Sequence, residues 1–223
     1  MSANTVTATL SFFAPPDNGE KPYYWIDDLP GRERANYKRD KIKAEYYPES
    51  IALIKEITGA AQVVPFDHTV RRRNPAEAES SAEKRQPVPY PHVDQTPASA
   101  RDRVERHMPA PAVTGLLAKR FQIINLWRPI GRPALDWPLA LCDARTYADR
   151  DGETYSVQYH ERYAWKYVRG LTPDEFVLIK CFDSIDDRSV AALTPHTAFE
   201  DPTTPKDAPF RESIEVRFLV FYD

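Results

Sequence analysis

The chain is short of glycine, of cysteine and of long apolar runs, and each shortage narrows what it can be. Its 223 residues include only 7 glycines against 21 prolines, which favours stiff, defined loops over flexible linkers. Its two cysteines, Cys142 and Cys181, each lie inside an apolar run, so we expect buried free thiols in a reducing compartment. No apolar run reaches the ~20 residues of a membrane span, and the N-terminus lacks the basic start and apolar core of a signal peptide. We therefore expect a cytoplasmic protein without a membrane partner.

Positive and negative charges are nearly balanced, which argues against a nucleic-acid partner. The formal net charge is -3, so the chain has no basic footprint for nucleic acid. Hydrophobic residues make up 42% of the sequence, enough for a sizeable core. We expect a small-molecule ligand, and the composition leaves a homodimer open.

The hydrophobic pattern predicts helices first and strands later. Residues 40–58 repeat apolar side chains at helical spacing, Gly59 is a stop, and Pro48 allows two helices there. We expect an edge strand in 5–13, a short strand in 61–68 and a charged helix in 98–107. We also expect the polar segment 95–108, together with the acidic and basic stretch 74–86, to close over the site as a lid. From residue 110 onward the pattern contains almost no helix, and it predicts strands at 121–127, 139–143, 154–160, 176–183, 197–199 and 213–222.

Many short strands separated by proline turns indicate a jelly roll. We predict a mainly β (α+β) fold whose core is a double-stranded β-helix, with N-terminal helices packed on one sheet. The expected organisation is a single domain over residues 1–223, with a helical layer in 1–60 and the jelly-roll core in 61–223.

Two histidines and one carboxylate stand where such a fold could bring them together. His92 and Asp94 are two residues apart, so a strand would place both side chains on one face. His196 opens a later strand, and strands distant in sequence lie side by side in a jelly roll. Two imidazoles and a carboxylate on one face of Fe(II) leave positions open for a co-substrate and oxygen. The alternative for His196 is a histidine that caps a turn between two prolines.

Three other histidines are weaker candidates as ligands: His68, His107 and His160. An arginine and a hydroxyl follow His196 and complete the set of groups that binds a 2-oxo acid. Arg211 and Ser213 are two residues apart, and a guanidinium binds a carboxylate through two parallel hydrogen bonds that lysine cannot copy. The alternative for Arg211 is a surface ion pair with Glu212, which would be worth little. Arg217 could replace Arg211 as the anchor, although we expect it to pair with Glu215.

Five residues are candidates for lining the pocket: Asn125, Trp127, Arg128, Lys180 and Arg217. The amide of Asn125 would need a partner inside a small barrel, whereas core packing is the favoured alternative for Trp127. Lys180 interrupts an apolar strand, and it either extends outward to solvent or pairs inside the barrel.

Blocks of sequence also resemble a known family. They are residues 66–71 (FDHTVR), 92–95 (HVDQ), 125–129 (NLWRP), 138–143 (PLALCD), 178–184 (LIKCFDS) and 195–217, which holds PHTAFEDP and RESIEVR. In order and spacing they resemble the fungal AsaB hydroxylase / gibberellin desaturase family, which also contains the cephem methoxylase subunit CmcJ. The resemblance runs from about Tyr46 to the C-terminus.

The resemblance implies an oxidoreductase that uses Fe(II), 2-oxoglutarate and O2 to hydroxylate, desaturate or cyclise a secondary metabolite. Carried over by match, the iron ligands are His92, Asp94 and His196, and the co-substrate anchors are Arg211 and Ser213. Two rivals remain at this point: an iron oxygenase that does not use 2-oxoglutarate, and a non-oxidative cupin-like isomerase or binding protein on the same barrel.

Overall fold

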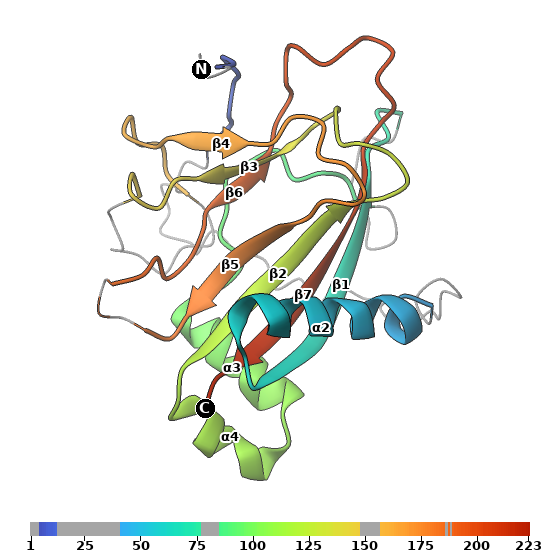
Figure 1. The fold of residues 1–223 in the computed structure, drawn as a ribbon. Helices are drawn as coiled ribbons and strands as arrows, with labels where there is room; N and C mark the ends of the chain where they lie inside the picture. Colours follow the sequence, from blue (N-terminus) through green and yellow to red (C-terminus); the bar gives the residue numbers. More distant parts are fainter. Residues whose placement is uncertain (1–4, 13–40, 77–84, 148–156, 186, 188) are drawn as a thin grey trace.

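The computed structural model describes residues 5–12, 41–76, 85–147, 157–185, 187 and 189–223 (Figure 1). Its elements, in chain order, are a π-helical turn η2 (Ile42–Tyr46), α2 (Tyr47–Thr58), β1 (Gln62–Arg72), α3 (Pro97–His107), α4 (Ala110–Leu117), β2 (Phe121–Pro129), β3 (Leu139–Cys142), β4 (Trp165–Tyr167), β5 (Val177–Asp183), β6 (His196–Ala198) and β7 (Glu212–Phe221). None of the helices in the described part of the chain is long and apolar enough to cross a bilayer.

The strands form two antiparallel sheets, which confirms the jelly-roll prediction. The larger sheet has the order β1-β7-β2-β5, and the smaller has the order β4-β3-β6. The last strand, β7, therefore lies between the first strand and the second, as Figure 1 shows. A single backbone bridge between His92 and His196 adds the segment before Asp94 to the edge of the smaller sheet.

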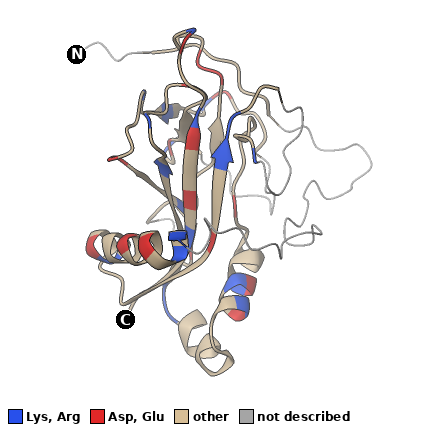
Figure 2. Ribbon diagram, turned by 90° about the vertical axis from the view of Figure 1, so that its right-hand side faces the viewer, with Lys and Arg blue, Asp and Glu red and all other residues tan. Residues whose placement is uncertain are grey.

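The alternation of β7 explains how the larger sheet is covered. Ile214, Val216 and Phe218 belong to an apolar cluster that includes the fully buried Ile54 of α2. Because neighbouring side chains on a strand point to opposite faces, Ser213, Glu215 and Arg217 face away from α2, into the barrel. The ribbon of Figure 2 is coloured blue and red for charged residues along α2 and α3, whereas α4 contains none.

The N-terminal helical region is continuous rather than split. The π-helical turn runs directly into α2, with Pro48 in the first turn of α2. A proline is tolerated there because the first N–H groups of a helix have no intrahelical acceptor. The helix ends at Gly59, whose φ of 68° lies in the left-handed region, as the sequence predicted.

Other expectations about secondary structure were wrong. Helix α4 was missed, although Pro109 and Pro111 stand at its start, where prolines are accepted. Residues 5–12 of the expected edge strand form no strand, and residue 13 lies outside the described residues. Residues 157–160 are irregular, residues 154–156 are not described, and the strand of this region is β4 instead. Strand β1 runs to Arg72 because its second half pairs with β7.

Helix α3 is part of the core, which contradicts the expected lid over residues 95–108. Ala100 and Val104 are fully buried and pack with Phe121 and Leu219 of the larger sheet. Most of the acidic and basic stretch expected to move with it, residues 77–84, lies outside the described residues.

The start of α3 allows a stability prediction. The Thr96 hydroxyl accepts a hydrogen bond from the Ser99 N–H at 3.2 Å, and the Ser99 hydroxyl accepts one from the Thr96 N–H at 2.9 Å. Thr96→Ala removes one half of this reciprocal cap, and we expect it to lower the free energy of unfolding by about 1 kcal/mol. Urea denaturation of the variant and the wild type measures the change, and an unchanged midpoint would contradict this role for the cap.

Candidate metal centre

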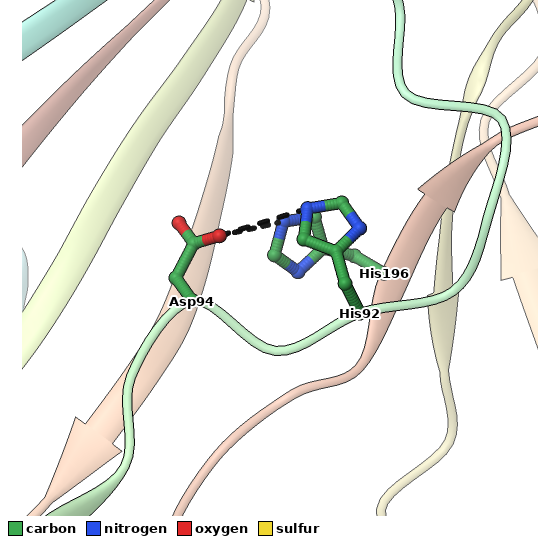
Figure 3. A group of neighbouring side chains, drawn as sticks. All are labelled: His92, Asp94 and His196. Atoms are coloured by element: carbon green, nitrogen blue, oxygen red, sulfur yellow. Dashed lines mark ion pairs between the residues drawn. The ribbon is translucent and has the colours of Figure 1, made fainter. Parts of the chain in front are cut away.

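Two histidines and an aspartate from different parts of the chain meet between the sheets. His92 and His196 exchange backbone hydrogen bonds, each N–H to the other carbonyl at 3.0 Å, and this bridge sets their imidazole centroids 4.4 Å apart. Asp94 follows two residues later in an irregular bend rather than on a regular strand. One potential ligand atom from each of the three residues lies within 4.8 Å of the other two (Figure 3).

Each imidazole is oriented so that Nε2 faces the carboxylate. The Nδ1 atom of His92 lies 2.9 Å from the Tyr90 carbonyl, and that of His196 lies 3.1 Å from the Thr194 carbonyl. A carbonyl can only accept, so Nδ1 carries the proton and Nε2 keeps its lone pair. The Nε2 atoms lie 3.6 Å and 3.8 Å from Asp94 Oδ1.

The surroundings of His92 and Asp94 favour the protonation states in which these side chains can bind a metal. Burial, together with the neighbouring His196, lowers the pKa of His92 to about 4, so its imidazole is neutral near pH 7. Burial opposes ionisation of Asp94, but the charge of Arg217 and the hydrogen bond from Asn125 help to hold the pKa of its carboxyl well below the usual range. Two imidazoles and one carboxylate are the donor set that suits a non-haem iron with open positions.

A buried cationic group lies at the start of β7. Arg211 is 3% exposed and Ser213 is 1% exposed. The Arg211 backbone N–H donates to Asp136 Oδ2 at 3.2 Å, its Nη1 donates to the Trp137 carbonyl, and its guanidinium carbon lies 5.5 Å from the centre of the Trp127 ring. Burial lowers the pKa of Arg211 to about 9, and the charge of Arg71 adds to this effect.

Two atoms of this group lack partners among the described residues. They are Arg211 Nε and Ser213 Oγ, both buried. An unsatisfied buried donor costs on the order of 1–3 kcal/mol. A bound carboxylate would accept hydrogen bonds from both atoms and offset the buried charge, so this group fits the far end of a dicarboxylate.

Comparisons with known proteins agree with this geometry. A family model described as an oxidoreductase/YMDC permease-like domain matches residues 24–221. The chain is 43% identical over 143 residues to aspirochlorine biosynthesis protein N of Aspergillus oryzae, covering 58% of this chain and 59% of that protein. It is 35% identical to the Fe(II)/2-oxoglutarate-dependent dioxygenase nvfI of Aspergillus novofumigatus, covering 81% of this chain and 67% of that protein.

The solved structure of the iron and alpha-ketoglutarate-dependent endoperoxidase NvfI matches with a TM-score of 0.71 at 33% identity, over 82% of this chain and 71% of that chain. The chain belongs to the AsaB-like family of fungal oxidoreductases. It spans less than two thirds of the length of its aspirochlorine relative.

Three of the five pocket candidates of this AsaB-like chain face the barrel interior: Asn125, Trp127 and Arg217. Asn125 and Arg217 are cross-strand neighbours, and both contact Asp94. Arg217 also pairs with Glu215 at 2.7 Å, as the sequence suggested.

The other two candidates, Arg128 and Lys180, do not face the barrel interior. Arg128 lies on the opposite face of β2, where it pairs with Glu49 of α2 at 3.2 Å and lies over the Tyr46 ring. Lys180 also lies on the outer face and pairs with Asp183 at 3.2 Å. Each follows or precedes an inward residue by one position, and the strand period of two turns it outward.

The three weaker histidines lie outside the cluster. His68 Nδ1 is 2.8 Å from the Tyr47 hydroxyl of α2. His107 stacks on Phe66, and His160 accepts a hydrogen bond from the Arg162 N–H at 3.1 Å.

The sequence reasoning missed two residues beside the Arg211 group. Arg71 is the cross-strand partner of Ser213, and its Nη1 donates to the Gln86 carbonyl at 2.9 Å. Burial lowers the pKa of Arg71, although the charge of Glu215 opposes the shift. The signal was present in the run of three arginines at 71–73, of which the strand period turns Arg71 toward the face of Ser213. Trp137 has a φ of 47°, unusual for a bulky residue, and nothing in the sequence marks it.

A cavity of about 780 Å³ lies on the side of the triad away from Arg211. Its walls include Gln95, Phe121 and Phe182. Along β7, Ser213 is level with Pro129, Arg217 with Asn125, and Phe221 with Phe121. Asp94 contacts Asn125 and Arg217, which lie between these two ends. The triad therefore lies between the Arg211 group and the cavity along the strands.

Proposed function

We propose that this chain is an Fe(II)/2-oxoglutarate-dependent oxygenase of small-molecule secondary metabolites. In this proposal His92, Asp94 and His196 hold the iron, and Arg211 with Ser213 binds the far carboxylate of 2-oxoglutarate. The observation that carries it is the presence of two groups in one barrel. In the first, the Nε2 atoms of His92 and His196 face the Asp94 carboxylate. In the second, Arg211 Nε and Ser213 Oγ are buried and lack partners among the described residues. The relatives named dioxygenase, hydroxylase/desaturase and endoperoxidase support the same chemistry.

When bound, iron with 2-oxoglutarate and O2 supplies the oxidising power for attack on an unactivated C–H bond. The residues of the chain supply orientation and dryness. Arg211 is held by the Trp137 carbonyl and lies over the Trp127 ring, so its remaining N–H groups are fixed before the co-substrate arrives. The fully or almost fully buried Ile123, Ile179 and Trp127 line the same interior and keep water away.

The cavity beside Phe121 is the proposed substrate site, because it lies across the triad from the co-substrate anchor. Phe121, Tyr147 and Phe182 offer aromatic walls for an apolar ring system, and charged side chains complete the lining: Arg101, Lys119, Arg120 and Asp183. The volume falls in the usual range for a small-molecule pocket, about 300–1,000 Å³. The outcome is hydroxylation, desaturation or ring closure. We also propose that α2 and the jelly-roll core act as one oxygenase domain, since Ile54 of α2 is buried against the larger sheet.

One reconstitution experiment tests this function. Metal-free protein is loaded anaerobically with Fe(II), titrated with 2-oxoglutarate while the metal-to-ligand absorption band is recorded, and then exposed to oxygen. The expected result is stoichiometric iron, a saturable band and release of succinate. Oxygen uptake without succinate would indicate an oxygenase that does not use 2-oxoglutarate, and a protein that binds no metal would indicate the non-oxidative alternative.

A further inference from the structure

The two oxygens of the Asp94 carboxylate have different surroundings. Oδ1 faces the two imidazoles, 3.6 Å from His92 Nε2 and 3.8 Å from His196 Nε2. Oδ2 points to the larger sheet, where it accepts a hydrogen bond from Asn125 Nδ2 at 2.6 Å and lies 3.5 Å from Arg217 Nε. One oxygen of the carboxylate is therefore turned to the two imidazoles, and the other is held by side chains of the larger sheet.

Asn125 is placed as a donor to carboxylates. It is 0% exposed, and its Nδ2 also lies 3.2 Å from Glu215 Oε1. Both neighbours can only accept, so the amide nitrogen rather than the oxygen must point at them. Its own Oδ1 has no hydrogen-bond partner among the described residues, which costs free energy. The hydrogen bonds that Nδ2 donates to Asp94 and Glu215 account for an amide at this buried position.

Arg217 is fixed by several acceptors at once. Its guanidinium lies 2.7 Å from Glu215, 3.2 Å from Asp67 and 3.5 Å from Asp94, and Nη1 also donates to the Thr69 hydroxyl at 3.0 Å. These acceptors come from β1, β7 and the segment that carries Asp94. A planar guanidinium held on several edges has little freedom to rotate, so it presents Nε to Asp94 Oδ2 in a constant direction.

From these contacts we infer that Asn125 and Arg217 are positioning residues that hold Asp94 Oδ2 and leave Oδ1 alone to face the metal. The inference rests on the proposed function, because it takes Asp94 as a ligand. A carboxylate free to turn could bind a metal through both oxygens and take up a position that a co-substrate or oxygen needs. Partners that orient a metal-binding carboxylate commonly change metal affinity about 10- to 100-fold when they are removed.

The strand that carries Asn125 also provides a matched control. Gln122 is a second buried amide on β2, and its Nε2 donates to the buried Asp183 carboxylate at 2.6 Å, outside the triad. Asn125→Leu and Gln122→Met each replace a buried amide with an apolar side chain of similar size. The first change removes the hydrogen bonds to Asp94 and Glu215, and the second removes those that Gln122 makes with Asp183 and the Tyr222 hydroxyl. Both variants should lose comparable stability, whereas only one of them touches Asp94.

The test uses Co(II) as a visible probe in the metal-free protein. Affinity is measured by competition with a chelating dye, and the absorption bands of bound Co(II) report its coordination. We expect Asn125→Leu to bind Co(II) about 10- to 100-fold more weakly with altered bands, and Gln122→Met to match the wild type within about twofold. If Asn125→Leu does not fold, Asn125→Ser takes its place. Its hydroxyl lies one bond closer to the backbone than Nδ2 and so loses the contact with Asp94, and it should weaken binding in the same direction.

The outcomes separate this inference from the proposed function. Wild-type binding that is lost in His92→Ala, combined with unchanged affinity and bands in Asn125→Leu or Asn125→Ser, would overturn the positioning role and leave the metal centre standing. Equal weakening in Asn125→Leu and Gln122→Met would show a general effect of stability and would also overturn it. A wild-type protein that binds no Co(II) and no Fe(II) would overturn both proposals.

Discussion

Alanine at His92 or at His196 is expected to abolish stoichiometric Fe(II) binding. Either change leaves one imidazole and one carboxylate, and two ligands hold Fe(II) poorly. The loss should exceed the about 10- to 100-fold that follows removal of a supporting group, because a ligand itself is gone. The two variants should behave alike, since both Nε2 atoms lie at nearly the same distance, 3.6 Å and 3.8 Å, from Asp94 Oδ1.

Metal analysis after anaerobic loading and desalting reads the result directly. His160→Ala is the control, because His160 lies outside the triad, where it accepts a hydrogen bond from the Arg162 N–H and lies beside the Tyr163 ring. It should retain wild-type iron. Near-full iron occupancy in either His92→Ala or His196→Ala would contradict the assignment of the centre, provided that circular dichroism shows both variants folded.

Local rules predicted most of what surrounds the triad. The alternation of apolar and polar residues along β7 is enough to separate Ile214 and Val216 from Ser213 and Arg217, and the larger sheet follows that division. A strand decides the face of each side chain by its period of two, so this part of the site needed only short-range information. The jelly roll was also predictable, because many short strands separated by proline turns are typical of double-sheet β folds.

The features that could not be predicted depend on the pairing of strands that are far apart in the sequence. Arg71 lies beside Ser213 only because β1 pairs with β7 in a register that sets these two residues opposite each other, although they are more than a hundred residues apart in sequence. Lys180 sits in an apolar strand, and its direction depends on the register between β2 and β5, which shifts between Ile123 and Ile124. The left-handed backbone of Trp137 arises from its surroundings, and its residue type gives no warning of it.

Lysine in place of Arg211 is expected to weaken 2-oxoglutarate binding about ten- to a hundredfold. A point charge replaces a guanidinium that lies over Trp127 and still has Nε free, and a lost hydrogen bond to a charged group costs on the order of 1.5–3 kcal/mol. Ser213→Ala should cost less, on the order of 1 kcal/mol or about fivefold, because it removes one neutral donor. Titrating 2-oxoglutarate into variants saturated with Fe(II), and following the metal-to-ligand absorption band, gives each affinity.

Arg217→Lys is the variant that decides between the two arginines. Arg217 is already surrounded by Glu215, Asp67 and Asp94, so it has no edge left for a further carboxylate, whereas Arg211 does. Its replacement should therefore lower stability and metal affinity while leaving 2-oxoglutarate binding at saturating iron within about threefold of the wild type, well under the cost of one charged hydrogen bond. The reverse pattern, with weak co-substrate binding in Arg217→Lys and normal binding in Arg211→Lys, would move the anchor to the level of Asn125. The co-substrate would then occupy the space in which Asn125 and Arg217 now hold Asp94, and the cavity beside Phe121 could no longer be the substrate side.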